Sequence, residues 1–334
     1  MKKILITGAS GFIGSFLVQE ALNQGYEVYA GVRPSSSKKY LTDSRIIFFE
    51  LLFSRIELIK EKLIYYERKI GRFDYIIHNA GITKALSKEE FDFVNLKHTI
   101  NFVQALIETN CVPDKFIYMS SLAAYGPGNE ITMQPIREDD VPNPVSSYGK
   151  SKLRAELFIT SLQNFPYLIF RPTGVYGPRE KDYFLMYKSI NHHLETYIGT
   201  SKQKLSFVYV KDLSSLIFKA LQSEIIGRSY FVTDGNQYNS QEFSNIVKSH
   251  LDKKTLKIVF PKFIVKIIAF CLEKFYAIFK RVPTLNTEKY LEISHRNWLC
   301  DSSAAMNDFD FTPKFNLENG LKETISWYKN ENLL

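Results

Sequence analysis

The sequence predicts an α/β fold, a doubly wound parallel sheet followed by a smaller, mostly helical C-terminal unit. In the N-terminal half, short runs of β-type apolar residues alternate with longer segments of helical periodicity. Such alternation is typical of a parallel sheet that helices cover on both faces. The 334 residues, of which 45% are hydrophobic and 23% charged, suffice for two structural units with buried cores.

The expected elements follow in the order that this fold requires. Strands are predicted at 3–7, 26–32, 46–50, 73–78, 115–120 and 167–171, and helices at 12–24, 54–69, 88–109 and 147–163. After a loop rich in Pro and Gly, we expect a helix near 182–193, a strand at 205–210, a helix at 212–223 and a strand at 229–233, then mostly helix from 237. Residues 1–172 with about 205–235 are therefore assigned to the sheet domain, and 173–204 with 236–334 to a capping unit.

Charge and cysteine content exclude several classes of protein. The net charge is +8, but the basic residues are scattered without an Arg/Lys block longer than two, so we expect no nucleic-acid partner. Cys111, Cys271 and Cys300 form neither a disulfide framework nor a metal-ligand spacing, which favours a reducing, cytoplasmic compartment and no metal. We expect Cys111 and Cys271 to be small core residues.

Membrane insertion is also disfavoured. The apolar run near the N-terminus ends after three residues in a glycine loop, which argues against a signal peptide. The longest unbroken apolar run, 267–272, is too short to span a bilayer.

The segment 262–280 has the pattern of a strongly apolar helix. Lys262, Lys266, Glu273 and Lys280 fall on one narrow stripe, and apolar residues cover the rest of the surface. Such a helix is usually buried or lies against a partner or a membrane surface. We expect burial within the chain, and the alternatives are a substrate-gating or peripheral membrane contact and a dimer contact.

A glycine-rich run directly follows the first predicted strand and opens a helix. It reads Thr7-Gly8-Ala9-Ser10-Gly11-Phe12-Ile13-Gly14. Gly8 permits a tight turn, Gly11 lets the backbone approach a pyrophosphate, and Gly14 allows close packing of helix and strand. The run therefore predicts a dinucleotide whose phosphates lie at the positive end of the helix.

The end of the second strand favours NADP(H), with NAD(H) as the alternative. A carboxylate there would bind the ribose 2′-hydroxyl, whereas an arginine accommodates a 2′-phosphate. This strand ends at Arg33, which Ser35, Ser36, Ser37, Lys38 and Lys39 follow, and no acidic residue lies between Glu27 and Asp43. A solvated loop without a ligand role is the other interpretation.

Tyr148 and Lys152 lie four residues apart in a predicted helix, so their side chains share one face. An ammonium near a phenol favours the phenolate, which makes the tyrosine a usable acid or base near neutral pH. Ser120 and Ser121 end the fifth strand, at the edge where open sheets bind ligands. We expect Ser120 to have a packing or capping role.

Together these motifs resemble the extended short-chain dehydrogenases/reductases of the NAD-dependent epimerase/dehydratase family, over nearly the whole chain. The resemblance implies a Rossmann sheet, an oxidoreductase and a homodimer formed through the helices at 88–109 and 147–163. It also implies that Ser121 and Tyr148 bind the reacting oxygen, with Tyr148 as general acid/base, and that Lys152 holds the nicotinamide ribose and tunes Tyr148. Asn95 would brace the backbone, and His78 would make a buried hydrogen bond.

The remaining site residues also come from the resemblance. The expected cofactor-binding residues, besides Tyr148 and Lys152, are Gly8, Ser10, Gly11, Phe12, Ile13, Gly14, Arg33, Glu50, Leu51, Asn79, Ala80, Gly81, Pro172, Gly174 and Val175. The expected substrate-binding residues are Lys84, Ser121, Thr173 and Tyr183.

Departures from the family pattern bear on the reaction. Leu122 and Ala123 occupy positions where 4,6-dehydratases carry an acid/base pair, so that class is disfavoured. Gly174 and Leu205 stand where epimerases have Asn and Arg for the sugar diphosphate, although Arg179, Lys202 or Lys204 could compensate. The pattern is closer to the dihydroflavonol reductase and 3β-hydroxysteroid dehydrogenase branch, whose substrates are largely apolar. We therefore expect an NADP(H)-dependent carbonyl/alcohol oxidoreductase; the alternatives are a nucleotide-sugar epimerase and a non-catalytic NAD(P)-binding regulator.

Overall fold

The structure is a computed structural model that describes residues 1–199 and 203–334. The chain divides into two compact units, each assembled from three segments. Unit 1 comprises Met1–Ala124, Ser147–Arg171 and Ser214–Tyr230. Unit 2 comprises Tyr125–Ser146, Pro172–Leu213 and Phe231–Leu334.

A seven-stranded sheet with the order β11-β6-β5-β4-β1-β2-β3 forms the centre of unit 1, and its neighbours from β6 to β3 are all parallel. The doubly wound fold is thereby confirmed. The strands are β1 (Lys3–Thr7), β2 (Glu27–Val32), β3 (Ile47–Glu50), β4 (Tyr75–His78), β5 (Lys115–Met119), β6 (Tyr167–Pro172) and β11 (Arg228–Val232). The strand order reverses between β1 and β4, and open α/β sheets bind ligands beyond the carboxyl ends at such a point.

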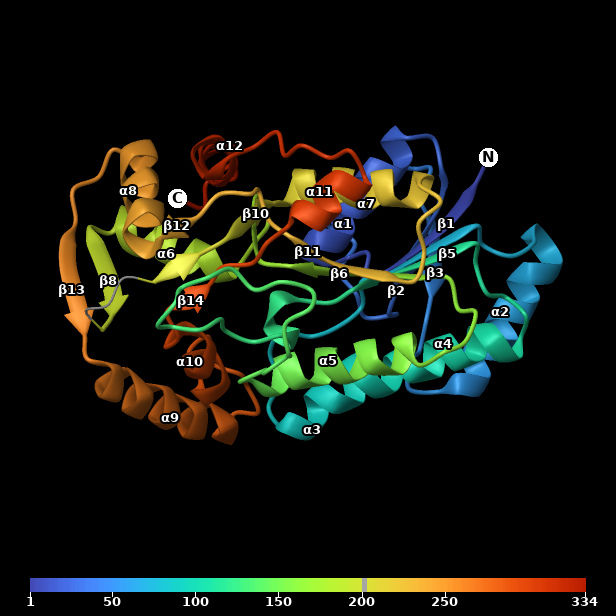
Figure 1. The fold of residues 1–334 in the computed structure, drawn as a ribbon, viewed down its shortest axis with the longest axis horizontal. Helices are drawn as coiled ribbons and strands as arrows, with labels where there is room; N and C mark the ends of the chain where they lie inside the picture. Colours follow the sequence, from blue (N-terminus) through green and yellow to red (C-terminus); the bar gives the residue numbers. More distant parts are fainter. Residues whose placement is uncertain (200–202) are drawn as a thin grey trace. The chain divides into compact units, whose positions relative to one another are not determined.

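Helices cover both faces of this sheet. Figure 1 shows α1 and α7 on one face and α4 and α5 on the other. The helical elements of unit 1 are α1 (Phe12–Asn23), α2 (Ile56–Ile70), α3 (Lys88–Phe91), a π-helix (Asp92–Lys97), α4 (His98–Glu108), a 3₁₀ turn (Leu122–Ala124), α5 (Ser147–Thr160) and α7 (Val210–Gln222). An apolar core that includes Leu5, Phe49, Phe102, Phe116 and Ile169 lies between α2, α4, α5 and the sheet.

Unit 2 combines helices with short sheets. Its strands are β7 (Gly174–Tyr176), β8 (Leu194–Ile198), β9 (Lys204–Leu205), β10 (Phe207–Tyr209), β12 (Tyr238–Asn239), β13 (Leu256–Phe260) and β14 (Asn297–Trp298). Its helices are α6 (Asp182–Asn191), α8 (Ser240–Leu251), α9 (Lys262–Ile278), α10 (Thr287–Ile293), α11 (Ser303–Asp308) and α12 (Leu317–Asn330). A second core, rich in tyrosine and phenylalanine, packs α6, α8 and α12 against β7 and β10.

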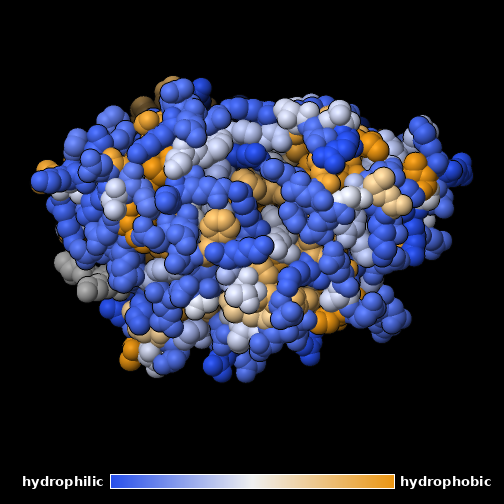
Figure 2. Space-filling view, turned by 90° about the horizontal axis from the view of Figure 1, so that it is seen from above, coloured by the Kyte–Doolittle hydropathy of each residue, from blue (hydrophilic) through white to orange (hydrophobic). Residues whose placement is uncertain are grey.

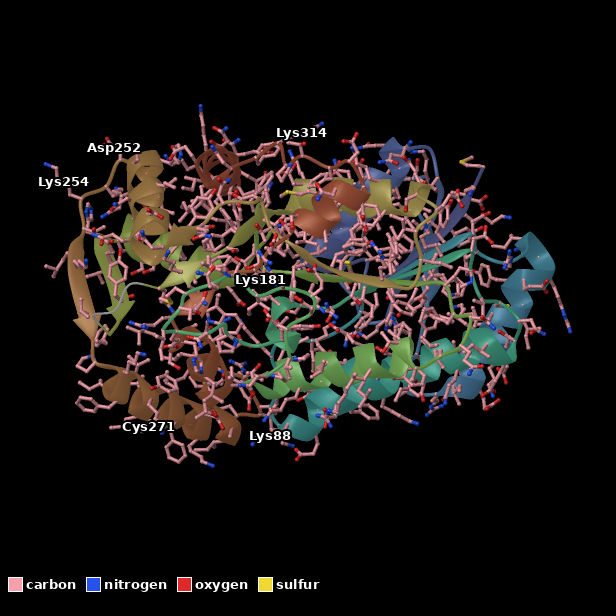
Figure 3. The ribbon with its side chains drawn as sticks, in the orientation of Figure 1. Lys88, Lys181, Asp252, Lys254, Cys271 and Lys314 are labelled. Carbon is pink, nitrogen blue, oxygen red and sulfur yellow. The ribbon has the colours of Figure 1, made fainter. Side chains whose placement is uncertain are left out.

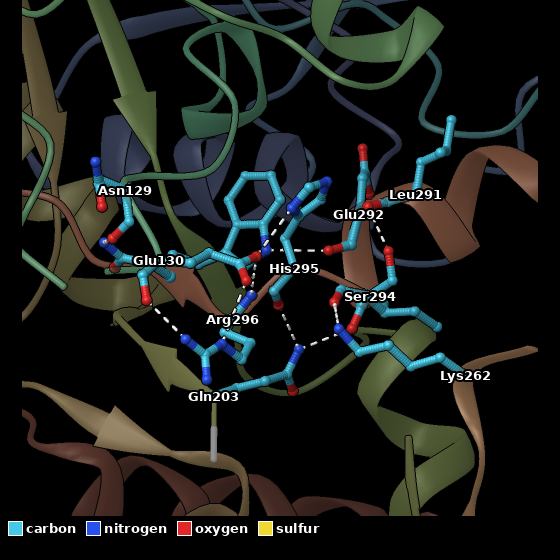
Figure 4. A network of polar contacts seen from close by, with 12 residues as sticks. Asn129, Glu130, Gln203, Lys262, Leu291, Glu292, Ser294, His295 and Arg296 are labelled. Atoms are coloured by element: carbon cyan, nitrogen blue, oxygen red, sulfur yellow. Dashed lines mark hydrogen bonds and ion pairs between the residues drawn. The ribbon is translucent and has the colours of Figure 1, made fainter. Parts of the chain in front are cut away.

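Polar contacts fix the loops of unit 2. Glu130 binds Arg296 and His295, and the Gln203 amide donates to the carbonyl oxygens of Ile293 and His295 (Figure 4). The turn between α8 and β13 contains Asp252 and Lys254 (Figure 3), and Asp252 has a left-handed φ of 53°. The contacts of Glu130 and Gln203 anchor the segment between α10 and β14.

Two expected elements are interrupted in the structure. The helix predicted at 88–109 contains the π-helix Asp92–Lys97 between α3 and α4. The strand predicted at 205–210 is split at Ser206 into β9 and β10, which belong to different sheets.

The expected burial of 262–280 is wrong, because in α9 only Val265 and Ala269 are buried. Cys111 is buried as expected, but Cys271 is exposed on the outer side of α9 (Figure 3). Among the residues that the structure describes, no helix is long and apolar enough to cross a membrane.

Candidate functional site

The glycine run after β1 forms a tight backbone cradle. Gly8 has a φ of 66°, and its carbonyl oxygen accepts a hydrogen bond of 3.0 Å from the Gly11 amide. A Cβ on Gly8 would lie 2.8 Å from the Asn79 carbonyl oxygen, and a Cβ on Gly14 would lie 2.8 Å from the Gly8 carbonyl carbon. Since both neighbours are backbone, neither position accepts a side chain without moving the loop.

The first turn of α1 is suited to an anion. Its N-cap is Gly11, no side chain caps it, and its first turn holds no acidic residue. The amide groups of a first helical turn have no partner within the helix, and the helix dipole makes this end positive. Ser10, Phe12 and Ile13 are half-buried beside Gly11, which is exposed. The cradle therefore fits the pyrophosphate of a dinucleotide.

A buried chain of hydrogen bonds ties the loop after β4 to the glycine loop. The two ring nitrogens of His78 lie 2.9 Å from Thr7 Oγ1 and 3.0 Å from Thr99 Oγ1. Thr7 Oγ1 also accepts from the Ala80 amide, and Thr99 Oγ1 donates to the Asn95 carbonyl oxygen. Burial lowers the pKa of His78 to about 3, so the imidazole is neutral and has the structural role expected of it.

Asn95 joins this loop to the helix that carries Tyr148. The side-chain NH₂ group of Asn95 donates to the Ile82 carbonyl oxygen and to Ser151 Oγ, both at 3.0 Å. Its side-chain oxygen Oδ1 accepts from the Ile82 backbone amide at 2.8 Å. Ser151 Oγ in turn donates to the Tyr148 carbonyl oxygen at 2.7 Å. Because Asn95 lies within the π-helix, this irregular turn directs a buried side-chain amide at Ser151 of α5, whose hydroxyl binds the first turn of that helix.

Lys152 lies beneath the loop after β4. Its Nζ donates to the Met119 carbonyl oxygen at 2.7 Å. A Cβ on Gly81 would lie 3.3 Å from Lys152 Nζ. Burial lowers the pKa of Lys152 to about 8, and the negative field of Glu156 partly opposes this effect. The lysine is therefore largely cationic near neutral pH.

Tyr148 and Ser121 border the same region of unit 1. Tyr148 is half-buried in the first turn of α5, and its ring centroid lies 6.1 Å from that of Phe91. Ser121 is half-buried at the start of the 3₁₀ turn that packs on α5, and its Oγ accepts from the Ala123 amide at 3.2 Å. Both side chains thus belong to elements at the carboxyl end of β5, where ligand chemistry is expected.

Sequence reasoning missed a buried ion pair behind this group. Arg171 donates to Glu156 through Nε and Nη2, with an ion-pair distance of 2.8 Å, and both side chains are almost completely buried. The Ser120 hydroxyl donates to the same carboxylate, so Ser120 braces this pair. The spacing Tyr148, Lys152, Glu156 repeats every four residues, and this signal could have placed Glu156 on the helix face that carries Tyr148 and Lys152.

The end of β2 forms an exposed turn that begins with Arg33. The Arg33 amide donates to Ser36 Oγ at 3.1 Å, and Lys38 Nζ lies 4.1 Å from the centroid of the Phe48 ring. Burial, and after it the charge of Arg33, lower the pKa of the nearby His98 imidazole. Arg33 therefore lies at the carboxyl end of β2 without a competing carboxylate in the turn 33–42.

The other expected cofactor residues differ in how they are placed. Asn79 and Ala80 are half-buried and Gly81 is exposed in the loop after β4, with the half-buried Lys84 farther along it. Glu50 is exposed at the end of β3, whereas the side chain of Leu51 is part of the core.

The expected nicotinamide-side residues, and Thr173 and Tyr183 among the expected substrate residues, lie in unit 2. Thr173 Oγ1 donates to the Ser206 carbonyl oxygen at 2.8 Å, and Gly174 and Val175 pair with β10. The Tyr183 ring packs against Phe207 and Phe243 in the core of the unit. Pro172 ends β6 and is buried, and Lys202 lies outside the described residues.

A side chain at Gly174 would require the aromatic side chains beside it to shift. A Cβ there would meet the Tyr183 hydroxyl and would lie 3.0 Å from a Phe207 ring carbon. Leu205, at the other position that departs from the epimerase pattern, packs half-buried against the same aromatic core. Gly174 and Leu205, the two residues that differ from the epimerase pattern, therefore both lie in apolar surroundings.

Comparisons with known proteins identify the family and the fold of the chain. Residues 4–232 match the model of the NAD dependent epimerase/dehydratase family. The chain is 24% identical to the UDP-glucose 4-epimerase of Vibrio cholerae over 347 residues, which cover 99% of this chain and 97% of the epimerase. It is 25% identical to the 3 beta-hydroxysteroid dehydrogenase/Delta 5-->4-isomerase of vaccinia virus (strain Ankara) over 360 residues, 96% of this chain and 97% of that enzyme.

A solved structure has the same fold. The UDP-glucose 4-epimerase of Thermus thermophilus, in complex with NAD, matches with a TM-score of 0.77 and 20% identity, covering 98% of this chain and 99% of that chain.

Proposed function

Because the chain belongs to the NAD dependent epimerase/dehydratase family, we propose that it is an NADP(H)-dependent oxidoreductase that interconverts a carbonyl and an alcohol on a small, apolar substrate. One observation carries the proposal: the buried Lys152, held on the Met119 carbonyl oxygen, shares a helix face with Tyr148 and lies beside the glycine-lined loops.

The residues of the chain have separate tasks in this reaction. Gly8, Gly11 and Gly14 admit the pyrophosphate against the backbone and the α1 terminus. Tyr148 delivers a proton to the carbonyl oxygen during reduction and takes it back during oxidation, and the ammonium of Lys152 favours the phenolate that remains. Ser121 donates a hydrogen bond to the same oxygen and polarises the carbonyl. The bound nicotinamide supplies or accepts the hydride.

The proposal of an apolar substrate is based on the apolar packing at two positions of unit 2. An epimerase of nucleotide sugars must neutralise a diphosphate, and unpaired phosphate charge is costly to bury. At Gly174 and Leu205, however, this chain has aromatic and aliphatic packing. The sequence similarity to a nucleotide-sugar epimerase keeps epimerisation as the second candidate.

Replacement of the tyrosine tests the reaction. We expect Tyr148→Phe to reduce the rate of NADPH-dependent reduction of apolar ketones and aldehydes by about 10²–10⁴-fold, since the proton donor is lost. NADPH binding, followed by fluorescence titration, should change little because the substitution leaves the glycine cradle after β1 unchanged. Retained turnover in the variant would refute the role of Tyr148, and turnover of a UDP-sugar by wild type would favour the epimerase.

Replacement of Arg33 tests the cofactor preference. We expect wild type to bind NADPH more tightly than NADH, and Arg33→Asp to reverse this order, because a carboxylate repels a 2′-phosphate and binds a 2′-hydroxyl. The measurement is a pair of fluorescence titrations on each protein. Tighter binding of NADH by wild type would contradict the preference for NADP(H).

A further inference from the structure

Helix α9 presents an apolar stripe to solvent along its whole length. Phe263, Ile267, Phe270, Cys271 and Ile278 recur at helical spacing on one face, and Phe263 and Ile278 have exposed fractions of 65% and 75%. In Figure 3, Cys271 points outward from this helix, away from the rest of unit 2. Exposed apolar patches of this extent mark interaction sites.

The face of the molecule that Figure 2 shows serves as a comparison. Hydrophilic residues cover most of the face shown in Figure 2, and the hydrophobic ones form small, separate patches there. Single exposed apolar side chains are normal in folded proteins. On α9, by contrast, several bulky apolar side chains are exposed on one face of a single helix.

The inner side of α9 is firmly packed, so the helix is fixed in this orientation within unit 2. Val265 and Ala269 are buried, and Lys262 Nζ donates to the Ser294 carbonyl oxygen at 2.7 Å (Figure 4). Glu273 accepts from the backbone amide of Thr287 at 2.9 Å and from its hydroxyl. The Glu273 side chain thus binds the first residue of α10.

The charges on α9 and directly after it are mostly positive. Segment 262–281 has one acidic residue, Glu273, and its basic residues are Lys262, Lys266, Lys274, Lys280 and Arg281. Lys274 lies within the stripe, with its Nζ 5.4 Å from the centroid of the Phe270 ring. Long basic side chains can pass along apolar surface and keep their charge at a polar boundary.

This combination matches an anionic lipid surface better than a second copy of the chain. Bulky apolar residues enter the boundary between headgroups and acyl chains, and lysines pair with lipid phosphates. A symmetric contact between two α9 helices would bring two such basic segments together, which like-charge repulsion disfavours. We propose that α9 docks unit 2 on an anionic membrane surface, with the stripe in the interfacial layer.

Sedimentation with vesicles tests the proposal on the full chain. We expect the protein to sediment with vesicles of phosphatidylcholine containing phosphatidylglycerol, far less with phosphatidylcholine alone, and progressively less as the salt concentration rises. Absence of binding to the anionic vesicles overturns the proposal.

Matched variants separate the stripe from general charge effects. Lys266→Gln and Lys274→Gln should each weaken binding roughly fivefold, and the double variant Ile267→Asn, Ile278→Asn should abolish it. Lys322→Gln, which removes an exposed lysine from α12, is the control and should bind as wild type does. Equal loss in the control would mean non-specific attraction and would overturn the assignment to α9.

Two further measurements complete the test. NADPH titration of each variant verifies that it is folded. Sedimentation equilibrium without lipid tests the competing occupant: a wild-type dimer that the Ile267→Asn, Ile278→Asn variant converts to a monomer would assign the stripe to a second copy and refute lipid docking.

Discussion

Single buried polar residues determine how the site of unit 1 is held. Glu156 and Arg171 form an ion pair away from water, and this pair also binds Ser120 at the end of β5. A buried pair of this kind adds little net stability, but removal of one partner leaves an uncompensated charge. The carboxylate also raises the pKa of Lys152 against the larger effect of burial. Glu156 thus holds Ser120 and Arg171 in place and also favours the charged form of Lys152.

His78 gives this unit a predictable dependence on pH. Its pKa is about 3 in the folded protein because of burial, and it has the ordinary value near 6.5 in the unfolded chain. The unfolded state therefore binds more protons between pH 6.5 and 3, and stability falls as the pH falls through this range. From pH 6.5 to 5 we expect this histidine alone to lower the free energy of unfolding by about 2 kcal/mol.

Urea unfolding at several pH values checks this expectation. His78→Gln should show a shallower loss of stability between pH 6.5 and 5 than wild type, although it starts from a lower value because the buried hydrogen bonds are disturbed. His192→Gln, at an exposed position, is the matched control and should keep the wild-type dependence. Equal slopes in wild type and His78→Gln would show that His78 does not cause the dependence.

Among the secondary-structure elements, the π-helix has the most direct connection to the proposed chemistry. It interrupts the path from α3 to α4 and lets Asn95 bind both the Ile82 backbone and Ser151 in α5. We expect Asn95→Ala to lower the free energy of unfolding by about 1–3 kcal/mol, as is typical when buried polar partners are left unsatisfied. It should also reduce kcat, because the first turn of α5 positions Tyr148.

A second buried asparagine supplies the control. Asn101 in α4 donates to the Phe53 carbonyl oxygen at 2.8 Å, but it does not contact α5 through this bond. We expect Asn101→Ala to lose similar stability while kcat and hydrogen exchange in the first turn of α5 stay near wild type. If both variants slow turnover equally, the loss of kcat follows from stability and Asn95 has no positioning role.

Comparison of the elements with the sequence shows which patterns carry information. Strands β1, β4 and β5 are short apolar runs at glycine or polar boundaries, and their predicted ends differ from the observed ones by at most two residues. The π-helix was not predicted, because a single turn with i→i+5 hydrogen bonds inside a longer helix leaves little trace in the apolar pattern of the sequence. The break at Ser206 was also missed, since no proline or glycine marks it.

The site shows the same contrast between local and distant information. Gly8, Tyr148 and Lys152 belong to short motifs, so their spacing along the chain was enough to predict them as candidate site residues. The partnership of Glu156 with Arg171 and Ser120 depends on the pairing of β5 with β6, which sequence separation hides. Exposure of α9 could not be predicted either, because an apolar helix surface predicts contact with something but does not identify the partner.

At the scale of the whole molecule, the chain passes repeatedly between the two units. Unit 1 needs the distant segment Ser214–Tyr230, which supplies most of β11 and of α7. Leu216, Ile217 and Phe218 of α7 are buried, and Lys115 Nζ donates to the Ala220 carbonyl oxygen at 2.9 Å. The sheet is therefore incomplete until residues far beyond β6 have been added.

We expect from this connectivity that the fragment 1–172 does not fold cooperatively. Without β11 and α7, the edge of β6 and the part of one sheet face that α7 covers are open to water, and the buried Lys115 loses its carbonyl partner. Near-UV circular dichroism during heating should show no sharp transition for this fragment, and NADPH should not bind. The control 1–330, which lacks only the last four residues after α12, should melt as the full chain does. A fragment 1–172 that melts sharply and binds NADPH would show that the first six strands suffice and that β11 and α7 are additions to a self-sufficient sheet.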